Sequence, residues 1–170
     1  MAWFTALPRK LRTARRFSLR ELALVSEAWV RLAWVRMRLR VAPYVWSRSI
    51  LQRAALGDPP PHRCDPELRN LPRMVRIAAR NHPWSMSCLH RSLVLHDMLR
   101  RRGVPALLRF GVRWRGDELN AHAWVECGGA VVNDAPDVAA SFMPLEGPAD
   151  GPSHRDAAEY LDANLPRRWG

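Results

Sequence analysis

Apolar residues follow two different periods along this chain, and together these predict helices followed by strands. A helical spacing of three and four residues begins after Ser18 and Glu21, whose separation is that of an N-terminal capping box. The apolar positions with this spacing are Leu22, Val25, Trp29, Leu32, Val35 and Leu39. From residue 106 to residue 114 every second residue is apolar, which is the period of a strand. The pattern predicts the α+β class.

Glycine and proline place the remaining elements. Helices are expected over 44–56, 74–80, from 88 to about 102, and 156–165; strands are expected over 106–114, 121–127, 130–134 and 141–145. Three proline residues and a glycine interrupt the chain within 57–61. We therefore expect an N-terminal helical region over 1–56, a proline-rich connection over 57–72 and a domain that carries the chemistry over 73–170.

The first long helix is amphipathic, and two interpretations of it stay open. Arg31, Arg36, Arg38 and Arg40 flank its apolar positions. The helix could pack on its own domain, or it could dock onto a membrane surface or a partner. Membrane contact is possible but is not what we expect.

The positive net charge of the chain permits several classes of partner. The chain has 170 residues and a formal net charge of +11, with Lys10 as the only lysine. Such a chain could meet nucleic acid, an anionic membrane or an acidic peptide. Its arginines are spread along the sequence and no nucleic-acid-binding motif is present, so we expect no nucleic-acid partner. A basic adaptor, resting on the arginines and eight tryptophans, remains the non-enzyme alternative.

Cysteine usage and the N-terminus favour the cytoplasm. Three cysteines at uneven spacing do not suggest a disulfide scaffold, so a reducing compartment is the simpler interpretation. No signal peptide is evident, and no window reaches the roughly 18 apolar residues of a membrane span. His62 and Cys64 lie two positions apart, but no second ligand pair accompanies them. We expect neither a metal nor a cofactor.

Cys88 is the candidate nucleophile. It lies where a polar lead-in, Ser85-Met-Ser87, meets an apolar helix pattern. The unpaired N–H groups and the positive dipole end of a helix favour a thiolate over a thiol, and the thiolate is the nucleophile. Taken alone, a cysteine buried as a small hydrophobe is the more common case.

His122 and Asp134, both in predicted strands, supply the other members of a catalytic triad. A thiol nucleophile needs a base, and the base needs a third group to orient it. A three-residue turn over 127–129 would pair His122 with Asp134 on one face of the hairpin, whereas a two-residue turn would place them on opposite faces. The triad interpretation therefore predicts the three-residue turn, and a two-residue turn without a bulge would count heavily against it. His90 and His96 are weaker base candidates because they share the helix of Cys88.

The oxyanion of an acyl intermediate would be bound by the backbone N–H of Cys88 and by one further donor. Trp84, Ser85 and Ser87 are near in sequence, and the pattern does not choose among them.

Five runs of residues, in this order and spacing, resemble one family: Cys88-Leu-His-Arg-Ser-Leu93, Leu99-Arg-Arg-Arg-Gly103, Phe110-Gly-Val-Arg113, Ala121-His-Ala-Trp-Val-Glu126 and Val132-Asn-Asp134. They are similar to the transglutaminase-like cysteine peptidases of lasso peptide biosynthesis, the leader peptidases or B proteins. The resemblance covers about residues 74–145. It implies a papain/transglutaminase-like α+β fold, with a cysteine-bearing helix packed on a small antiparallel sheet and preceded by helices.

The resemblance also implies a function and partners. Cys88 would be the nucleophile, His122 the base and acid, and Asp134 the orienting residue in removal of the leader from a lasso precursor peptide. Fused members begin with a winged-helix domain that binds the leader. This chain opens with helices instead, so we expect a separate leader-recognition protein and possibly contact with the ATP-dependent cyclase. Related enzymes use the same triad with an amine acceptor, so an amide-forming acyltransferase is the alternative.

Overall fold

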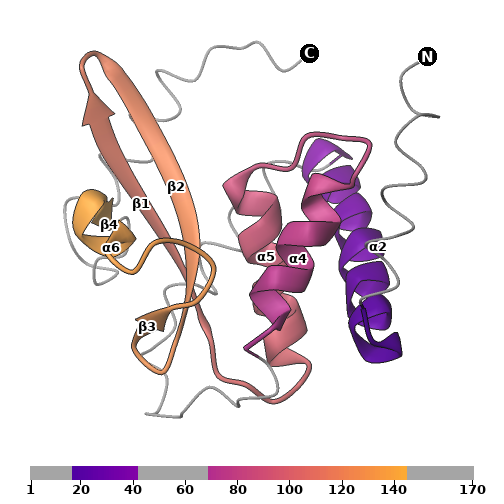
Figure 1. Cartoon of the computed structure of the whole chain (residues 1–170). Coiled ribbons are helices and arrows are strands. Elements are labelled where there is room, and N and C mark those ends of the chain that lie inside the picture. The colour runs from indigo at the N-terminus through magenta and orange to yellow at the C-terminus, as the bar shows by residue number, and fades with distance from the viewer. Residues whose placement is uncertain (1–16, 42–68, 145–170) are drawn as a thin grey trace.

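The computed structural model describes residues 17–41 and 69–144 (Figure 1). In chain order the elements are α2 (Leu19–Val41), α4 (Leu71–Arg80), α5 (Cys88–Arg100), β1 (Leu107–Arg115), β2 (Glu118–Cys127), β3 (Ala130–Val131), α6 (Val138–Ser141) and β4 (Met143–Pro144). Helix α5 lies between the sheet and α2, and α4 packs beside it (Figure 1). The predicted α+β class, with the cysteine-bearing helix on a small antiparallel sheet, is confirmed.

Helix α2 begins where the capping box predicts. The N–H of Ser18 donates to Glu21 Oε2 at 2.9 Å, and the N–H of Glu21 donates to Ser18 Oγ at 3.2 Å. No glycine or proline interrupts the 23 residues that follow. Ala28, Leu32 and Val35 are buried in the core shared with α4 and α5. The helix thus packs on the part of the chain that follows it, which is the first of its two interpretations.

A second set of apolar side chains on α2 stays exposed. Val30, Trp34, Met37 and Val41 are 62%, 52%, 59% and 75% exposed. Their spacing of four, three and four residues places them along one side of the helix. The guanidinium of Arg38 lies 3.6 Å from the centre of the Trp34 ring. The core therefore uses only part of the apolar surface of α2.

Helices α4 and α5 supply most of the remaining core. α4 begins at Leu71, earlier than the expected residue 74, because a proline is tolerated in the first helical turn, where its missing N–H has no intrahelical partner. α5 ends as predicted: Gly103 has a φ of 73°, and the N–H of Val104 donates to the Leu99 carbonyl at 3.1 Å. The buried apolar side chains of the two helices are Leu71, Met74, Val75, Ala78, Val94, Leu95, Met98 and Leu99.

The sheet has the order β3-β2-β1-β4 and is antiparallel throughout. Strands β1 and β2 form a long hairpin that extends beyond the helices (Figure 1). Alternation along β2 sends Val125 and Cys127 into the core beneath α5, while His122 and Trp124 occupy the other face. His122 pairs with Gly111 across the hairpin.

The three-residue turn predicted after β2 is wrong. Glu126 pairs with Val131 and Cys127 with Ala130, so residues 128–129 form a two-residue loop. Both glycines have positive φ, 58° and 77°, as a type I′ turn requires. Strand β3 also ends at Val131 rather than at the expected 134, and the chain bends away from the ladder there.

Several expectations lie outside the described residues: the helices over 44–56 and 156–165, the proline-rich run and the pair His62 and Cys64. Cys127, by contrast, is described and is disulfide-bonded, so the expectation that the cysteines are reduced is wrong for this residue. No helix in the described segments is long and apolar enough to cross a membrane.

Candidate active site

Cys88 is the first residue of α5, as the sequence predicts. The preceding Ser87 is extended, with φ −68° and ψ 172°, and its carbonyl accepts the N–H of Arg91 at 3.3 Å. The Cys88 thiol is free and half-buried. Within the described part of the chain its backbone N–H has no hydrogen-bond acceptor, as expected for the first helical residue.

His90 caps this helix. Its Nδ1 accepts the N–H of Ser87 at 3.3 Å and lies 2.6 Å from Ser87 Oγ. Burial, and then the positive charge of Arg36, lower the pKa of His90 below its usual value, which favours the neutral imidazole. Because that nitrogen is engaged, His90 serves as a cap and not as a base. The sequence signature of a capping box has Glu or Gln at this position, so the motif alone does not reveal the role.

His122 and Asp134 are brought together. His122 Nε2 lies 2.8 Å from Asp134 Oδ2. The predicted turn is not the reason: Asp134 reaches the ring because the chain leaves the ladder after Val131. The other ring nitrogen, Nδ1, has no hydrogen-bond partner among residues 17–41 and 69–144. That nitrogen is available to exchange a proton.

Asp134 is held in the carboxylate form. Burial alone would raise its pKa, but the N–H of Ala135, the hydrogen bond and charge of His122, and the charge of Arg91 together lower the pKa below its usual value. The Ala135 N–H donates to Oδ1 at 2.9 Å, so both carboxylate oxygens are engaged.

Phe142 and Gly111 fix the setting of the His122 ring. The Phe142 ring stacks on the imidazole with centroids 5.0 Å apart and an angle of 22°. A Cβ at Gly111 would lie 2.7 Å from the Phe142 Cβ and 3.0 Å from the Trp124 ring. A glycine opposite His122 therefore lets the aromatic rings close over this face of the sheet.

A buried polar network, which the sequence did not reveal, joins the elements that carry the three candidate residues. Ser92 Oγ donates to the Ala123 carbonyl at 2.8 Å, and Asn133 Nδ2 donates to Ser92 Oγ at 2.9 Å. The N–H of Val125 donates to Asn133 Oδ1 at 2.8 Å, while its carbonyl accepts the N–H of Val132 at 3.0 Å. Ser92 follows Cys88 by one helical turn, Ala123 follows His122, and Asn133 precedes Asp134. The network thus sets the three candidates relative to one another.

Cys88 and His122 border adjoining cavities and do not form a hydrogen bond with each other. Cys88 lines a cavity of about 560 Å³, and His122 lines one of about 350 Å³. Asp134 and Ala135 line both. Catalytic hydrogen bonds are often long before substrate binds and shorten in the complex. The structure therefore joins the candidate base to its candidate orienting group, and the candidate nucleophile lines a cavity that Asp134 also lines.

Two of the three candidates for the second oxyanion donor, Ser87 and Trp84, have backbone N–H groups that already make hydrogen bonds, whereas the N–H of Ser85 makes none within the described residues. The N–H of Ser87 is taken by His90, and the N–H of Trp84 points to His82 Nδ1 at 3.4 Å. The N–H of Cys88 remains available. The described residues contain no group of three or more His, Cys, Asp or Glu residues that could hold a metal ion.

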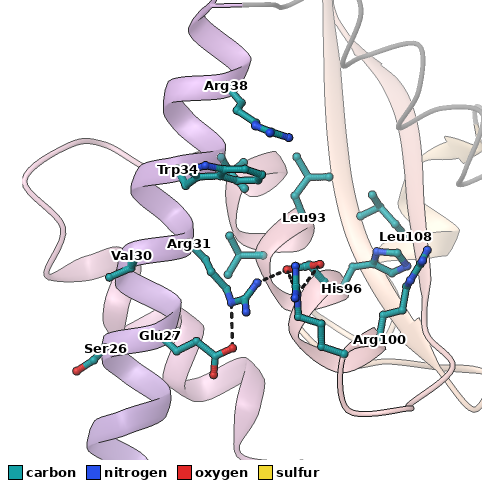
Figure 2. A pocket seen from close by; sticks show the side chains of 14 residues that line it. Ser26, Glu27, Val30, Arg31, Trp34, Arg38, Leu93, His96, Arg100 and Leu108 are labelled. Carbon is teal, nitrogen blue, oxygen red and sulfur yellow. Dashed lines mark hydrogen bonds and ion pairs between the residues drawn. The ribbon is translucent and has the colours of Figure 1, made fainter.

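His96 lies elsewhere. It lines a groove of about 1000 Å³ between α2 and α5, together with Trp34, Arg38 and Leu93 (Figure 2). The groove does not include Cys88, His122 or Asp134.

A sequence model of the transglutaminase-like superfamily matches residues 28–147. The match contains Cys88, His122 and Asp134 and extends from within α2 to beyond β4. Comparison with curated proteins and with solved structures gave no match.

Proposed function

The chain belongs to the transglutaminase-like superfamily, and from that premise we propose that it is a cysteine peptidase that removes the leader segment from a lasso precursor peptide. Membership is consistent with cysteine peptidase or acyltransferase chemistry. The observation that carries the proposal is the His122–Asp134 pair beside the cavity of Cys88. The lasso substrate rests on the resemblance of the motifs around these residues.

The proposed reaction proceeds through a thioester. Cys88 Sγ, with its proton transferred to His122, attacks the scissile carbonyl and forms a C–S bond. The amine of the departing fragment leaves with the proton from His122. His122 then takes a proton from water, whose oxygen attacks the thioester to give a free carboxylic acid and restore the thiol. Asp134 holds the imidazole through Nε2, so Nδ1 is the nitrogen that exchanges protons.

We propose that a separate leader-recognition protein delivers the substrate and docks on the groove between α2 and α5. Figure 2 shows Val30, Trp34 and Arg38 of α2 on one side and Leu93 and His96 of α5 on the other. Exposed apolar and basic side chains side by side suit a partner with apolar and acidic residues. The cytoplasm is the proposed compartment, although the disulfide bond of Cys127 is unusual in a reducing environment, and the ATP-dependent cyclase is a further partner that the resemblance implies.

Reconstitution tests the proposal. Wild-type protein with the precursor and the leader-recognition protein should release the leader as a free acid. Cys88→Ala should lower the rate by at least about 10⁴-fold, because the nucleophile is lost. Arg80→Gln, on the exposed side of α4, is the folded control. Cleavage by Cys88→Ala at the wild-type rate would contradict the mechanism.

The superfamily match favours one second candidate, an acyltransferase that forms an amide. The two differ in the molecule that attacks the thioester. Mass spectrometry of the product separates them: hydrolysis adds the mass of water to the two fragments, whereas transfer to an amine leaves a new amide bond.

A further inference from the structure

We propose that the cavity beside Cys88 is a subsite for an acidic side chain of the substrate, formed by arginines of α4 and α5. This inference rests on the proposed function and adds to it a chemical requirement on the residues that flank the cut. No metal or cofactor takes part in it.

Four arginines line this cavity together with the nucleophile. Arg69 precedes α4, and Arg73 and Arg76, three residues apart within α4, lie on one side of that helix. Arg91, on α5, follows Cys88 by three residues and lies on the same side of its own helix. The two helices thus direct positive charge toward one space of about 560 Å³, which can hold several atoms of a peptide side chain.

Negative charge inside the cavity is already engaged. Among the described residues that line the cavity, Asp134 is the only carboxylate, and its two oxygens are bound by His122 and Ala135. Glu21 approaches Arg73 at 3.7 Å from α2. The backbone carbonyl of Ser87 accepts Arg91 Nε at 3.4 Å. The described part of the cavity lining therefore carries more positive than negative charge.

Arg69 and Arg76 make no hydrogen bond or ion pair within the described residues. Guanidinium groups bind carboxylates through two parallel N–H···O bonds, and a carboxylate between like charges also relieves their repulsion. A peptide whose scissile carbonyl lies at Cys88 would bring a neighbouring side chain into this space. An aspartate or glutamate there satisfies the two arginines.

Alkylation of Cys88 tests the charge of the subsite without any cleavage. Full-length protein is treated with iodoacetate, which is anionic, or with iodoacetamide, which is neutral, and modification of Cys88 is followed by mass spectrometry. The iodoacetate-to-iodoacetamide rate ratio should exceed that of a small neutral thiol by about three- to tenfold at low salt. Salt at about 1 M should remove the difference.

Matched variants assign the effect to the cavity. The double variant Arg69→Gln/Arg76→Gln should bring the ratio down toward that of the small thiol. Arg80→Gln removes an arginine from the same helix outside the cavity and should leave the ratio unchanged. The subsite is overturned if the iodoacetate-to-iodoacetamide ratio of the wild type equals that of the small thiol. It is also overturned if the double variant and Arg80→Gln give the same ratio.

A second measurement addresses side chains and separates this inference from the proposed function. Acetyl-glutamate amide should slow alkylation of wild-type Cys88 by iodoacetamide more than acetyl-glutamine amide does, and the double variant should lose the preference. Equal protection by the two amides overturns the side-chain claim. If both alkylation results hold while no precursor is cleaved, the proposed function fails and the subsite for an acidic side chain stands.

Discussion

At the scale of the residue, opposing influences on Asp134 decide how the candidate base is held. Burial favours the neutral acid, whereas Ala135, His122 and Arg91 favour the carboxylate, and their sum lowers the pKa. An ionised carboxylate accepts the His122 N–H and fixes the tautomer and the orientation of the ring. The same pair should therefore be visible in the pH dependence of stability.

Replacing Asp134 should remove a pH-dependent part of the stability. The folded pKa lies below the ordinary 3.8, so the stabilisation is fully present above about pH 4 and is lost as pH falls through the lowered value. The melting temperature of wild type should exceed that of Asp134→Asn near neutral pH, and the gap should close on acidification. Thermal melts at several pH values check this. A gap that widens toward acid would contradict the assignment.

Gly111 should not tolerate a side chain. The Cβ of Gly111→Ala would lie 2.7 Å from the Phe142 Cβ, so the aromatic layer over His122 has to shift. We expect a loss of about 1–3 kcal/mol in the free energy of unfolding, measured by urea titration, together with slower cleavage. Phe142→Ala removes the stacked ring without the clash and serves as the comparison. A Gly111→Ala variant as stable as wild type would show that the layer adapts freely.

At the scale of the element, the sequence predicted the helices and strands that have a periodic pattern, and it predicted the turn after β2 wrongly. The alternation over 106–114 and the polar lead-in Ser85-Met-Ser87 predicted β1 and the start of α5 closely. The turn after β2 was predicted wrongly because the triad interpretation required His122 and Asp134 to pair within the hairpin, whereas Asp134 lies beyond the end of β3. A period-two pattern does not show where a strand ends, nor that a side chain such as that of Asn133 accepts a backbone N–H beyond that point. His122 and Asp134 were nevertheless the right pair to expect together.

The network of Ser92 and Asn133 should be cooperative. Ser92→Ala leaves the Asn133 amide without its acceptor, and Asn133→Ala leaves the N–H of Val125 unpaired, so each should cost about 1–3 kcal/mol. The double variant should lose less than the sum of the two. Urea unfolding of all four proteins gives the coupling. Ser141→Ala, which removes an exposed bond of 3.4 Å, should change stability by less than about 0.5 kcal/mol. Strict additivity would mean that the two residues act separately.

At the scale of the whole molecule, the expected division into a helical region over 1–56 and a chemical domain over 73–170 stays a prediction. The sequence places a proline-rich run between them, which is typical of a linker. The described core, however, contains Leu32 of α2 together with Leu95 of α5 and Val125 of β2. Periodicity does not show which residues far apart in the sequence pack together, because an apolar helix such as α2 can bury more than one of its faces. The exposed apolar side of α2 and the arginines beside Cys88 were missed for the same reason.

If α2 and the remaining elements unfold as one unit, a destabilising substitution in α2 should also lower the urea concentration at which Cys88 becomes exposed. Leu32→Ala removes a fully buried side chain and should cost about 2–5 kcal/mol. Met37→Ser, on the exposed side of the same helix, should cost less than about 0.5 kcal/mol. In Leu32→Ala, tryptophan fluorescence and the alkylation rate of Cys88 should change at the same, lower urea concentration, because a shared core exposes the nucleophile when it opens. A transition of the fluorescence that precedes any change at Cys88 would instead support two separate domains. The groove between α2 and α5 would then lie at a domain boundary, and a partner docked there could act on the site by holding the two parts together.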